Sequence, residues 1–253
     1  MTKYLSIVLP AYNEVKNLRR GVLSSVNDFL KNKKFSWEVL VVDDGSTDET
    51  VQMAEEFAKA HEGFSVLKEP HRGKAATVIA GMLQAKGEVI LFSDMDQSTP
   101  IDQIEKLLPK FKSGYDVAIG SRNGRPGQTY IRKLMAYGWI FLRTLILRLP
   151  YKDTQCGFKA FKKSAAEKIF SRMQVFTQAL DRGSEFSSPA VNAGFDLEVL
   201  YIARKLKLRV AEVPVEWYEY GEREEVSPIK DSLEGLRDLF KVRINALMGK
   251  YKQ

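Results

Sequence analysis

Short apolar runs alternate with amphipathic segments along the first part of the chain, and this alternation limits the possible folds more than any other feature. Runs of this length predict strands, and the segments between them have helical periodicity. The predicted strands are Leu5–Pro10, Val39–Val42, Phe64–Leu67, Val89–Ser93 and Val117–Ile119. The predicted helices are Glu14–Lys31, Thr50–Ala60, Gly73–Ala85 and Ile101–Phe111. This order is typical of βαβ units, and it predicts an α/β fold in which helices flank a mostly parallel central sheet.

Two carboxylates directly follow the apolar strand that ends at Ser93. Alternate residues of a strand lie on the same side, so Asp94 and Asp96 can point at one position. Carboxylates at the carboxyl end of a parallel strand, where open α/β sheets bind ligands, can hold Mg²⁺ or Mn²⁺ against a phosphorylated substrate. For an isolated Asp-x-Asp pattern, solvated turn residues leading to Pro100 are the commoner interpretation. The ends of the other strands favour the metal site.

Polar groups follow three further strands at the same predicted edge of the sheet. These groups are Tyr12-Asn13-Glu14, Asp43-Asp44-Gly45-Ser46 and Gly120-Ser121-Arg122. Four such groups in register indicate a binding site, because acidic side chains there can accept hydrogen bonds from a base or from ribose hydroxyls. Lys74 follows Gly73 at a predicted helix start, where its charge and the free backbone NH groups can meet phosphate. The glycine patterns of dinucleotide-binding folds and of P-loops do not occur in the sequence.

Composition restricts the partners and the compartment. The chain has 253 residues, 44% of them hydrophobic, which is enough for one domain with a large core. Its net charge of +7 favours an anionic partner: nucleotide phosphates, a phosphorylated acceptor, an acidic membrane face or nucleic acid. Nucleic acid is the least favoured, because the basic residues are dispersed and no nucleic-acid-binding motif occurs. A single cysteine, Cys156, and an N-terminal apolar run too short for a signal peptide lead us to expect a cytoplasmic protein.

Two later segments have amphipathic helix patterns. Residues Ile131–Leu149 place large apolar residues on one half of a helix and four basic residues on the other, namely Arg132, Lys133, Arg143 and Arg148. This pattern is typical of an interfacial helix, and a core-facing helix with a solvated basic face is the alternative. No apolar run approaches the roughly 20 residues of a membrane-spanning helix, so any membrane contact is expected to be peripheral. The segment from Ser227 to Leu247 predicts a C-terminal helix that packs on the domain, contacts a membrane or forms a dimer seam.

Five motifs, in this order and spacing, resemble the signature series of family 2 glycosyltransferases with a GT-A fold. They are Pro10-Ala-Tyr-Asn-Glu14, Val42-Asp-Asp-Gly-Ser-Thr-Asp48, Arg72-Gly-Lys74, Asp94-Met-Asp96 and Gly120-Ser-Arg122. Three later segments resemble the dolichyl-phosphate β-glucosyltransferase branch and, more distantly, other polyprenyl-phosphate glycosyltransferases such as the dolichyl-phosphate mannosyltransferases. They are Asp153–Phe161, Gly194–Tyr201 and Glu212–Trp217. The resemblance covers nearly the whole chain, with residues 174–191 as the exception.

The resemblance implies an enzyme that transfers a hexose with inversion from a nucleotide sugar, UDP-glucose being favoured, to a polyprenyl or dolichyl phosphate. It divides the single predicted domain, residues 1–253, into a nucleotide-sugar half (1–125), an acceptor half (126–226) and a C-terminal amphipathic helix (227–253). The residues that it implies for nucleotide-sugar binding are Pro10, Tyr12, Glu14, Asp43, Asp44, Lys74, Asp94, Met95 and Arg223. Asp94 and Asp96 are the implied metal ligands. In the mannosyltransferases a metal-binding glutamine stands two residues after the second aspartate, whereas here Ser98 has that place and Gln97 follows Asp96 directly.

A polyprenyl phosphate acceptor has consequences for the mechanism. Its second ionisation lies near about pH 6, so its oxygen is an anion at neutral pH and needs no strong general base. We expect Arg122 and Arg132 to grip this phosphate, since guanidinium groups match it in a bidentate way. Asp96, with its metal ion, is expected to stabilise the departing diphosphate. Asp153 is expected to orient the sugar or Arg132, with a structural cap as the alternative. Peripheral association with the cytoplasmic face of an anionic membrane follows from this acceptor.

Three alternatives stay open at this point. The sugar can go to a hydroxyl of a glycan or protein, which requires a base, and Asp153 is then the expected base. The donor can be GDP-mannose instead of a UDP-sugar. The chain can also be a catalytically idle nucleotide-sugar-binding or scaffold protein, although the intact Asp94, Asp96 and Lys74 argue against this.

Overall fold

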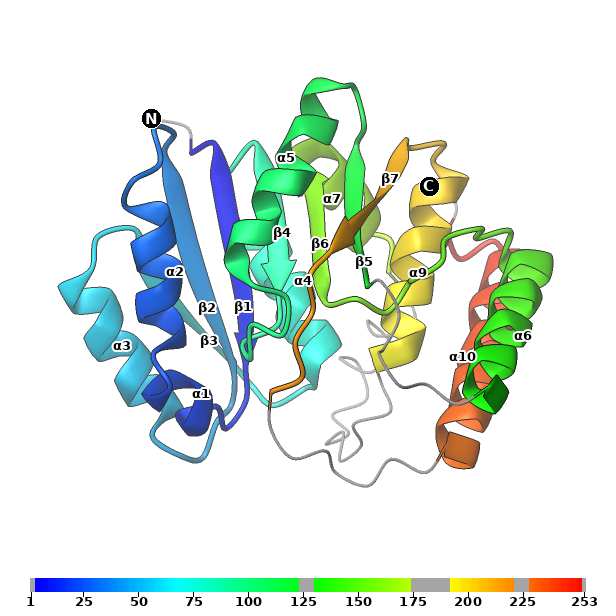
Figure 1. Ribbon diagram of the computed structural model, residues 1–253, viewed down its shortest axis with the longest axis horizontal. Helices are drawn as coiled ribbons and strands as arrows, with labels where there is room; N and C mark the ends of the chain where they lie inside the picture. The colour runs from blue at the N-terminus through cyan, green and yellow to red at the C-terminus, as the bar shows by residue number, and fades with distance from the viewer. Residues whose placement is uncertain (1–2, 123–129, 174–191, 221–227, 252–253) are drawn as a thin grey trace.

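The computed structural model describes residues 3–122, 130–173, 192–220 and 228–251, which form an α/β fold around a seven-stranded sheet (Figure 1). The strand order is β3-β2-β1-β4-β6-β5-β7. The strands are β1 (Leu5–Ala11), β2 (Trp37–Asp44), β3 (Phe64–Glu69), β4 (Val89–Ser93), β5 (Val117–Arg122), β6 (Phe158–Lys162) and β7 (Val210–Val215). The first five correspond to the predicted strands, and the prediction of a mostly parallel sheet is confirmed.

Strand β6 is the antiparallel member of the sheet and was not predicted. It pairs with β4 on one side and with β5 on the other, and it runs against both. Its N-terminal end therefore lies at the edge where β4 and β5 end. The backbone NH of Asp94 donates a hydrogen bond of 3.2 Å to the carbonyl oxygen of Gly157, the residue before β6. The insertion of β6 thus brings residues 153–157 to the edge at which the sequence predicts a site.

Helices connect and flank the strands. They are α1 (Val15–Arg19), α2 (Val22–Leu30), α3 (Thr50–Ala60), α4 (Lys74–Gln84), α5 (Ile104–Lys112), α6 (Tyr130–Leu147), α7 (Lys163–Phe170), α9 (Asn192–Lys205) and α10 (Pro228–Leu247), with the 3-10 turn η1 (Ile101–Gln103) before α5. The predicted helix Glu14–Lys31 is wrong as one element. Gly21 adopts a left-handed φ of 84°, which separates α1 from α2.

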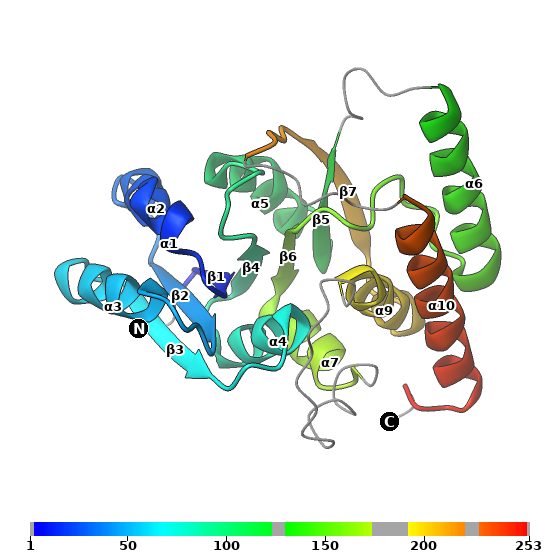
Figure 2. The same cartoon turned by 90° about the horizontal axis from the view of Figure 1, so that it is seen from below.

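The alternation of side chains along each strand builds a hydrophobic core on each face of the sheet. In β1, Leu5, Ile7 and Leu9 belong to one core and Val8 belongs to the other. Helices α2, α3 and α5 pack on the face that carries Leu5, Ile7 and Leu9, which we call the first core. Helices α4, α7 and α9 pack on the face that carries Val8, which we call the second core (Figures 1 and 2).

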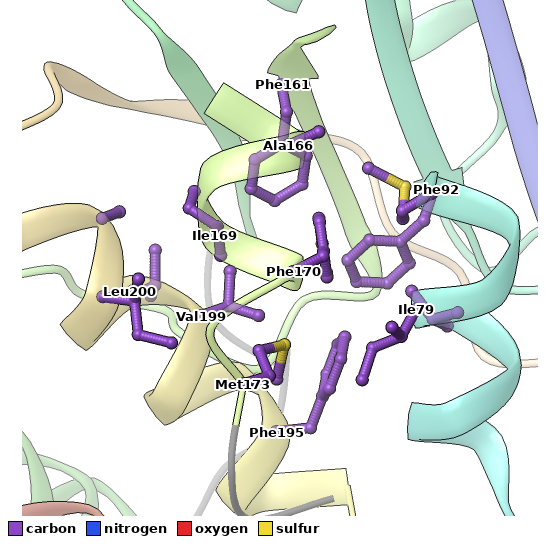
Figure 3. Close-up of a cluster of buried hydrophobic side chains, with 14 of the residues drawn as sticks. Ile79, Phe92, Phe161, Ala166, Ile169, Phe170, Met173, Phe195, Val199 and Leu200 are labelled. Atoms are coloured by element: carbon purple, nitrogen blue, oxygen red, sulfur yellow. The ribbon is translucent and has the colours of Figure 1, made fainter. Parts of the chain in front are cut away.

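Phenylalanine rings pack among aliphatic side chains in the second core (Figure 3). Phe92 of β4 meets Phe195 of α9 edge to face, with ring centroids 5.9 Å apart. Phe161 of β6 meets Phe170 of α7 in the same way at 5.3 Å. Such pairs bury large apolar areas in defined geometries. The packing therefore holds α9 in a defined position against β4, the strand that leads to Asp94.

Helices α6 and α10 lie side by side, outside the helices that cover the sheet (Figures 1 and 2). They approach closely at Gly235 of α10, where an added Cβ would lie 3.2 Å from the indole ring of Trp139 in α6. The face of α6 turned to solvent is apolar: Tyr137, Phe141 and Leu145 are between 67% and 70% exposed. In the described part of the chain, no helix is both long and apolar enough to cross a membrane.

Arg143 was expected on a solvated basic face of α6, and the structure shows that this expectation is wrong for Arg143. Its side chain is only 1% exposed, and its guanidinium donates hydrogen bonds to Thr154 Oγ1 at 3.0 Å and to the carbonyl oxygens of Leu149 and Tyr151. Burial lowers the pKa of Arg143. Helical periodicity cannot detect this role, because the loop that covers Arg143 follows the helix in sequence and folds back over it. Arg143 thereby anchors the loop that carries Asp153.

Candidate active site

The four predicted polar groups lie along one edge of the sheet. Strands β1, β2 and β4 are parallel neighbours, and β5 runs in the same direction beyond the antiparallel β6. Their C-terminal ends form the lower edge of the sheet in Figure 1. The residues after these strands are therefore brought together by topology, as the sequence predicts.

Lys74 and Asp94 form an ion pair at this edge, with 2.6 Å between Nζ and Oδ1. Lys74 is the first residue of α4 and follows Gly73, which has a φ of 88°. Burial acts to lower the pKa of Lys74, but the attraction of Asp94 outweighs it and the pKa is raised. The side chain therefore stays an ammonium ion beside a carboxylate at the start of a helix, an arrangement suited to phosphate.

Gly157 makes room for the Asp94 carboxylate. A Cβ added at Gly157 would lie 2.0 Å from Asp94 Oδ2, far inside any permitted contact. Asp94 can hold its observed position only because residue 157 has no side chain. Gly157 lies within the family-like segment Asp153–Phe161, but no role was predicted for it.

Asp96 is held by the turn that follows it. Its Oδ1 accepts a hydrogen bond from the Ser98 backbone NH and its Oδ2 accepts one from Ser98 Oγ, both at 2.8 Å. Gln97 has a φ of 50° and directs its amide back to Ser93 Oγ and to the carbonyl oxygen of Asp94, at 3.1 and 3.0 Å. Ser98 thus orients the second aspartate, and Gln97 closes the turn beneath the first.

Asp44 anchors the loop that leads to Lys74. Its two carboxylate oxygens accept hydrogen bonds from the backbone NH groups of Arg72 and Gly73, each at 2.9 Å. His71 Nδ1 lies 2.9 Å from Asp44 Oδ2. Asp44 was predicted to line the nucleotide pocket, and its contacts show that it positions the start of α4.

Asp43 has one occupied oxygen and one open oxygen. Its Oδ2 accepts hydrogen bonds from the backbone NH groups of Gly45 and Ser46, at 2.9 and 3.0 Å, which forms the turn after β2. Its Oδ1 is buried and has no hydrogen-bond partner among the described residues. A buried acceptor without a donor is costly, so this oxygen is suited to receive a donor from a ligand.

The other residues predicted for nucleotide binding differ in what they expose. The Tyr12 ring is exposed and stacks on His71, with centroids 4.2 Å apart and planes 18° from parallel. Pro10 is buried inside β1, and the Met95 side chain is buried in the core, so both can offer a ligand only backbone atoms. Burial raises the pKa of Glu14, and the carboxylates of Asp96 and Asp94 add to the rise.

Arg122 and Asp153 form a bidentate pair across the β5 end. Arg122 Nε donates to Asp153 Oδ2 at 2.6 Å, and Nη2 donates to Oδ1 at 2.9 Å. The Glu212 carboxylate accepts the backbone NH groups of Lys152 and Asp153, at 3.0 and 2.8 Å, and so fixes this loop. Burial acts to raise the pKa of Asp153, but the hydrogen bonds and charge of Arg122 outweigh it and the pKa is lowered.

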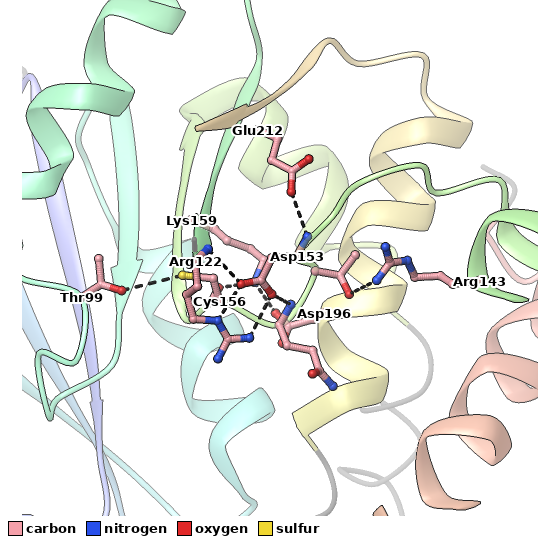
Figure 4. Close-up of polar contacts among 10 residues, drawn as sticks. Thr99, Arg122, Arg143, Asp153, Cys156, Lys159, Asp196 and Glu212 are labelled. Atoms are coloured by element: carbon pink, nitrogen blue, oxygen red, sulfur yellow. Dashed lines mark hydrogen bonds and ion pairs between the residues drawn. The ribbon is translucent and has the colours of Figure 1, made fainter. Parts of the chain in front are cut away.

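Another ion pair, Lys159 with Asp196, is buried beside the partly buried pair of Arg122 and Asp153, and it was not predicted (Figure 4). Lys159 of β6 is 0% exposed, and its Nζ donates to Asp196 Oδ1 of α9 at 2.6 Å and to the carbonyl oxygen of Cys156 at 2.5 Å. Burial raises the pKa of Asp196 in spite of the Lys159 charge. Each charge stands between apolar neighbours in the sequence, and this is the pattern that could have revealed the pair.

Some of the predicted site features lie outside the part of the chain that the structure describes. Arg223 and residues 174–191 lie outside the described residues, and Arg132 belongs to α6 but its side chain is not described. Among the residues that are described, no group of three or more His, Cys, Asp or Glu could hold a metal ion. A metal ion here would have two aspartates as protein ligands and would need further oxygens from a substrate.

Comparison with known proteins relates the chain to glycosyltransferases. The model of the family described as glycosyl transferase family 2 matches residues 6–170. The chain is 34% identical to a dolichyl-phosphate beta-glucosyltransferase of Drosophila melanogaster, over 98% of this chain and 77% of that protein. It is 32% identical to the Homo sapiens protein of the same name, over 99% of this chain and 78% of that protein.

Solved structures share the fold. Mannosyl-3-phosphoglycerate synthase from Rubrobacter xylanophilus superposes with a TM-score of 0.67 and 17% identity, over 99% of this chain and 76% of that one. Glucosyl-3-phosphoglycerate synthase from Mycobacterium tuberculosis, in complex with Mn²⁺, UDP and glucosyl-3-phosphoglycerate, superposes with a TM-score of 0.61 and 18% identity. That match covers 95% of this chain and 80% of the synthase chain.

Proposed function

The chain belongs to glycosyl transferase family 2 and is a glycosyltransferase, and from this premise we propose that it transfers glucose from UDP-glucose to a dolichyl or other polyprenyl phosphate. The observation that carries the proposal is the cluster of Asp94, Lys74 and Asp96 at the ends of parallel strands. The relatives named dolichyl-phosphate beta-glucosyltransferase support glucose as the sugar and dolichyl phosphate as the acceptor, because they align with nearly the whole chain.

The donor side is suited to a metal-bound diphosphate. Asp94 Oδ1 is buried and meets only the Lys74 ammonium among the described residues, and Ser98 holds both oxygens of Asp96 in a fixed turn. Asp94 and Asp96 would hold Mg²⁺ or Mn²⁺, as hard oxygen ligands do when substrate phosphates complete the coordination. A bound ion would offset the charge of the departing UDP. Lys74 adds a second positive charge at the same place.

The acceptor side favours a phosphate over a hydroxyl. A hydroxyl acceptor needs a base, but Asp153 is paired with Arg122 and its lowered pKa makes it a weak one. A polyprenyl phosphate is already an anion at neutral pH. Its oxygen attacks carbon 1 of the glucose while the bond from that carbon to UDP breaks. This single displacement converts the α-linked donor into a β-linked product.

The same proposal includes peripheral contact with a membrane, where such an acceptor resides. Its support is the exposed apolar row on α6, Tyr137, Phe141 and Leu145, which the neighbouring α10 extends. The exposed apolar residues of α10 and of the turn after it are Leu233, Phe240, Ile244, Leu247 and Met248. Apolar patches of this kind on a soluble fold commonly mark a lipid or protein contact.

A transfer assay tests the proposal. Radiolabelled UDP-glucose, UDP-N-acetylglucosamine and GDP-mannose would each be incubated with a short polyprenyl phosphate, with and without Mn²⁺ or Mg²⁺. We expect label from UDP-glucose to enter an organic-extractable product, and chelator or Asp96→Ala to abolish it. Label that enters the lipid only from GDP-mannose would overturn the donor assignment.

The same assay separates the acceptors. A panel of glycan and peptide hydroxyl acceptors would replace the polyprenyl phosphate. Transfer to one of these, with none to the lipid, would overturn the acceptor assignment. Asp196 would then be the base to examine, because its pKa is raised whereas that of Asp153 is lowered.

A further inference from the structure

A cavity lies where the C-terminal ends of α6, α9 and α10 meet, and its volume is about 340 Å³. Its lining residues are Leu145, Ile146, Arg148, Tyr201, Arg204 and Arg243. In Figure 1 these helix ends point away from the edge at which β1, β4 and β5 end. On α9, Arg204 lies eight residues after Asp196, which is about 12 Å along the helix axis. The cavity is therefore separate from the candidate active site.

Three guanidinium groups line this cavity, and no carboxylate is among its lining residues. Arg148 and Arg243 are exposed, and neither side chain has an ion pair or hydrogen bond with another described residue. Arg204 is partly buried and donates one hydrogen bond, from Nη1 to the carbonyl oxygen of Leu147 at 3.3 Å. Most N–H donors of the three guanidinium groups therefore remain available to a ligand or to water.

Helix dipoles alone do not account for this arrangement. A basic residue near the C-terminus of a helix interacts favourably with the dipole. Arg204 lies in the last turn of α9 and Arg148 directly follows α6, whereas Arg243 lies before the last turn of α10. That effect is confined to the last turn of each helix, and it does not require arginines from three helix ends to face one cavity. Arg148 even occupies a left-handed backbone position, with a φ of 55°, where a helix usually ends in glycine.

We propose that this cavity binds a phosphate-bearing group, and that its source is the headgroup of an anionic phospholipid. Guanidinium forks match phosphate oxygens, and the volume is that of a small-ligand site. Leu145, which lines the cavity, continues the exposed apolar row of Tyr137 and Phe141 on α6. A headgroup in the cavity would therefore have an apolar surface beside it for its acyl chains. The lipid source rests on the proposed membrane contact, whereas the phosphate chemistry does not.

Vesicle binding by the full chain tests this inference. The double variant Arg148→Gln/Arg243→Gln would be compared with wild type on phosphatidylcholine vesicles with and without phosphatidylglycerol. Lys34→Gln/Lys112→Gln is the matched control, because it removes the same charge from exposed positions elsewhere. We expect the cavity variant to bind the phosphatidylglycerol vesicles roughly tenfold more weakly or worse, and the control to change less than about twofold.

Two further arms distinguish the sources of phosphate and the two proposals. Equal losses in both double variants, or no loss in either, would overturn the cavity as a phosphate site. If glycerol 3-phosphate binds wild type by calorimetry, and the cavity variant loses that binding but not vesicle binding, a soluble phosphate compound is the ligand and the lipid source is wrong. Sugar transfer in detergent is expected to be unchanged in the cavity variant. If the cavity variant binds vesicles more weakly than the control variant, but wild type shows no sugar transfer, the proposed function is wrong and the cavity inference stands.

Discussion

The two sides of the sheet edge hold their charges in different ways. On the donor side, after β2 and β4, carboxylates are fixed by backbone NH groups or by one ammonium, and Asp43 Oδ1 has no hydrogen-bond partner among the described residues. On the acceptor side, near β5 and β6, charged side chains neutralise each other in closed pairs, Arg122 with Asp153 and Lys159 with Asp196.

The difference separates two tasks. Fixed carboxylates with an open oxygen can receive a metal ion or ligand NH groups without rearranging, which is the preorganisation that stabilises a leaving group. Closed pairs instead keep buried charges satisfied until a ligand arrives. The donor side is therefore expected to respond to substitution mainly in activity, and the deeper acceptor-side pair mainly in stability. The following substitutions test this contrast.

The largest effect is expected at the deepest pair. Lys159→Met would leave Asp196 buried without its partner, and the variant should lose about 3–5 kcal/mol of unfolding free energy in denaturant titrations. Lys168→Met, at an exposed position of α7, is the control and should change stability by less than about 0.5 kcal/mol. A loss at Lys159 no greater than in the control would mean that the pair is not a stability element.

Gly157→Ala should act on activity, because residue 157 precedes β6 but lies against Asp94 of the donor side. The new Cβ would collide with Asp94 and displace its carboxylate, so transfer should fall by about 100-fold or more. Gly138→Ala is the matched control, because a Cβ at Gly138 would meet no atom within 4 Å. Initial rates and thermal unfolding would be measured for both variants. Wild-type turnover by Gly157→Ala would show that the position of the Asp94 carboxylate does not matter for transfer.

A smaller effect is expected from Asp153→Asn. The substitution weakens the ion pair with Arg122, so kcat/KM should fall by about tenfold. It removes no general base, so the pH profile of transfer should keep its shape. A fall to the uncatalysed rate, with the fold intact by circular dichroism, would restore Asp153 as the base of a hydroxyl acceptor.

The smallest effect is a pH dependence of stability at the same position. Because the folded-state pKa of Asp153 is lowered, its contribution is present above the usual carboxyl pKa and is lost as the pH falls towards the folded-state value. The difference in unfolding free energy between wild type and Asp153→Asn should therefore shrink as the pH falls below about 4. A difference that stays constant or grows in acid would contradict the pairing.

Local sequence patterns were sufficient to predict the strands and many of the site residues on the donor side. The predicted strand Val89–Ser93 has the observed bounds, and each of the five predicted strands exists. Apolar runs in a parallel sheet are buried on both faces, so their pattern is distinct and their ends are marked by the first polar residue. The predicted gathering of Asp43, Lys74 and Asp94 followed from the common direction of these strands.

The acceptor side depends on contacts that local patterns do not contain. The antiparallel direction of β6 has no sequence mark of its own, yet it decides that Gly157 and Lys159 reach the site. Arg143 has the spacing of a surface residue, but a later loop covers it. Asp196 is buried because α9 packs on β4, a contact between segments far apart in the chain. These placements are tertiary effects, which override local periodicity.

The most direct test of the contrast is calorimetric binding of UDP with and without Mn²⁺ to wild type, Asp94→Asn and Asp153→Asn. We expect Mn²⁺ to strengthen UDP binding to wild type and to Asp153→Asn, and Asp94→Asn to lose this gain. If UDP binding still depends on Mn²⁺ in Asp94→Asn but no longer does so in Asp153→Asn, the diphosphate site lies on the acceptor side. This result would contradict the proposed role of Asp94.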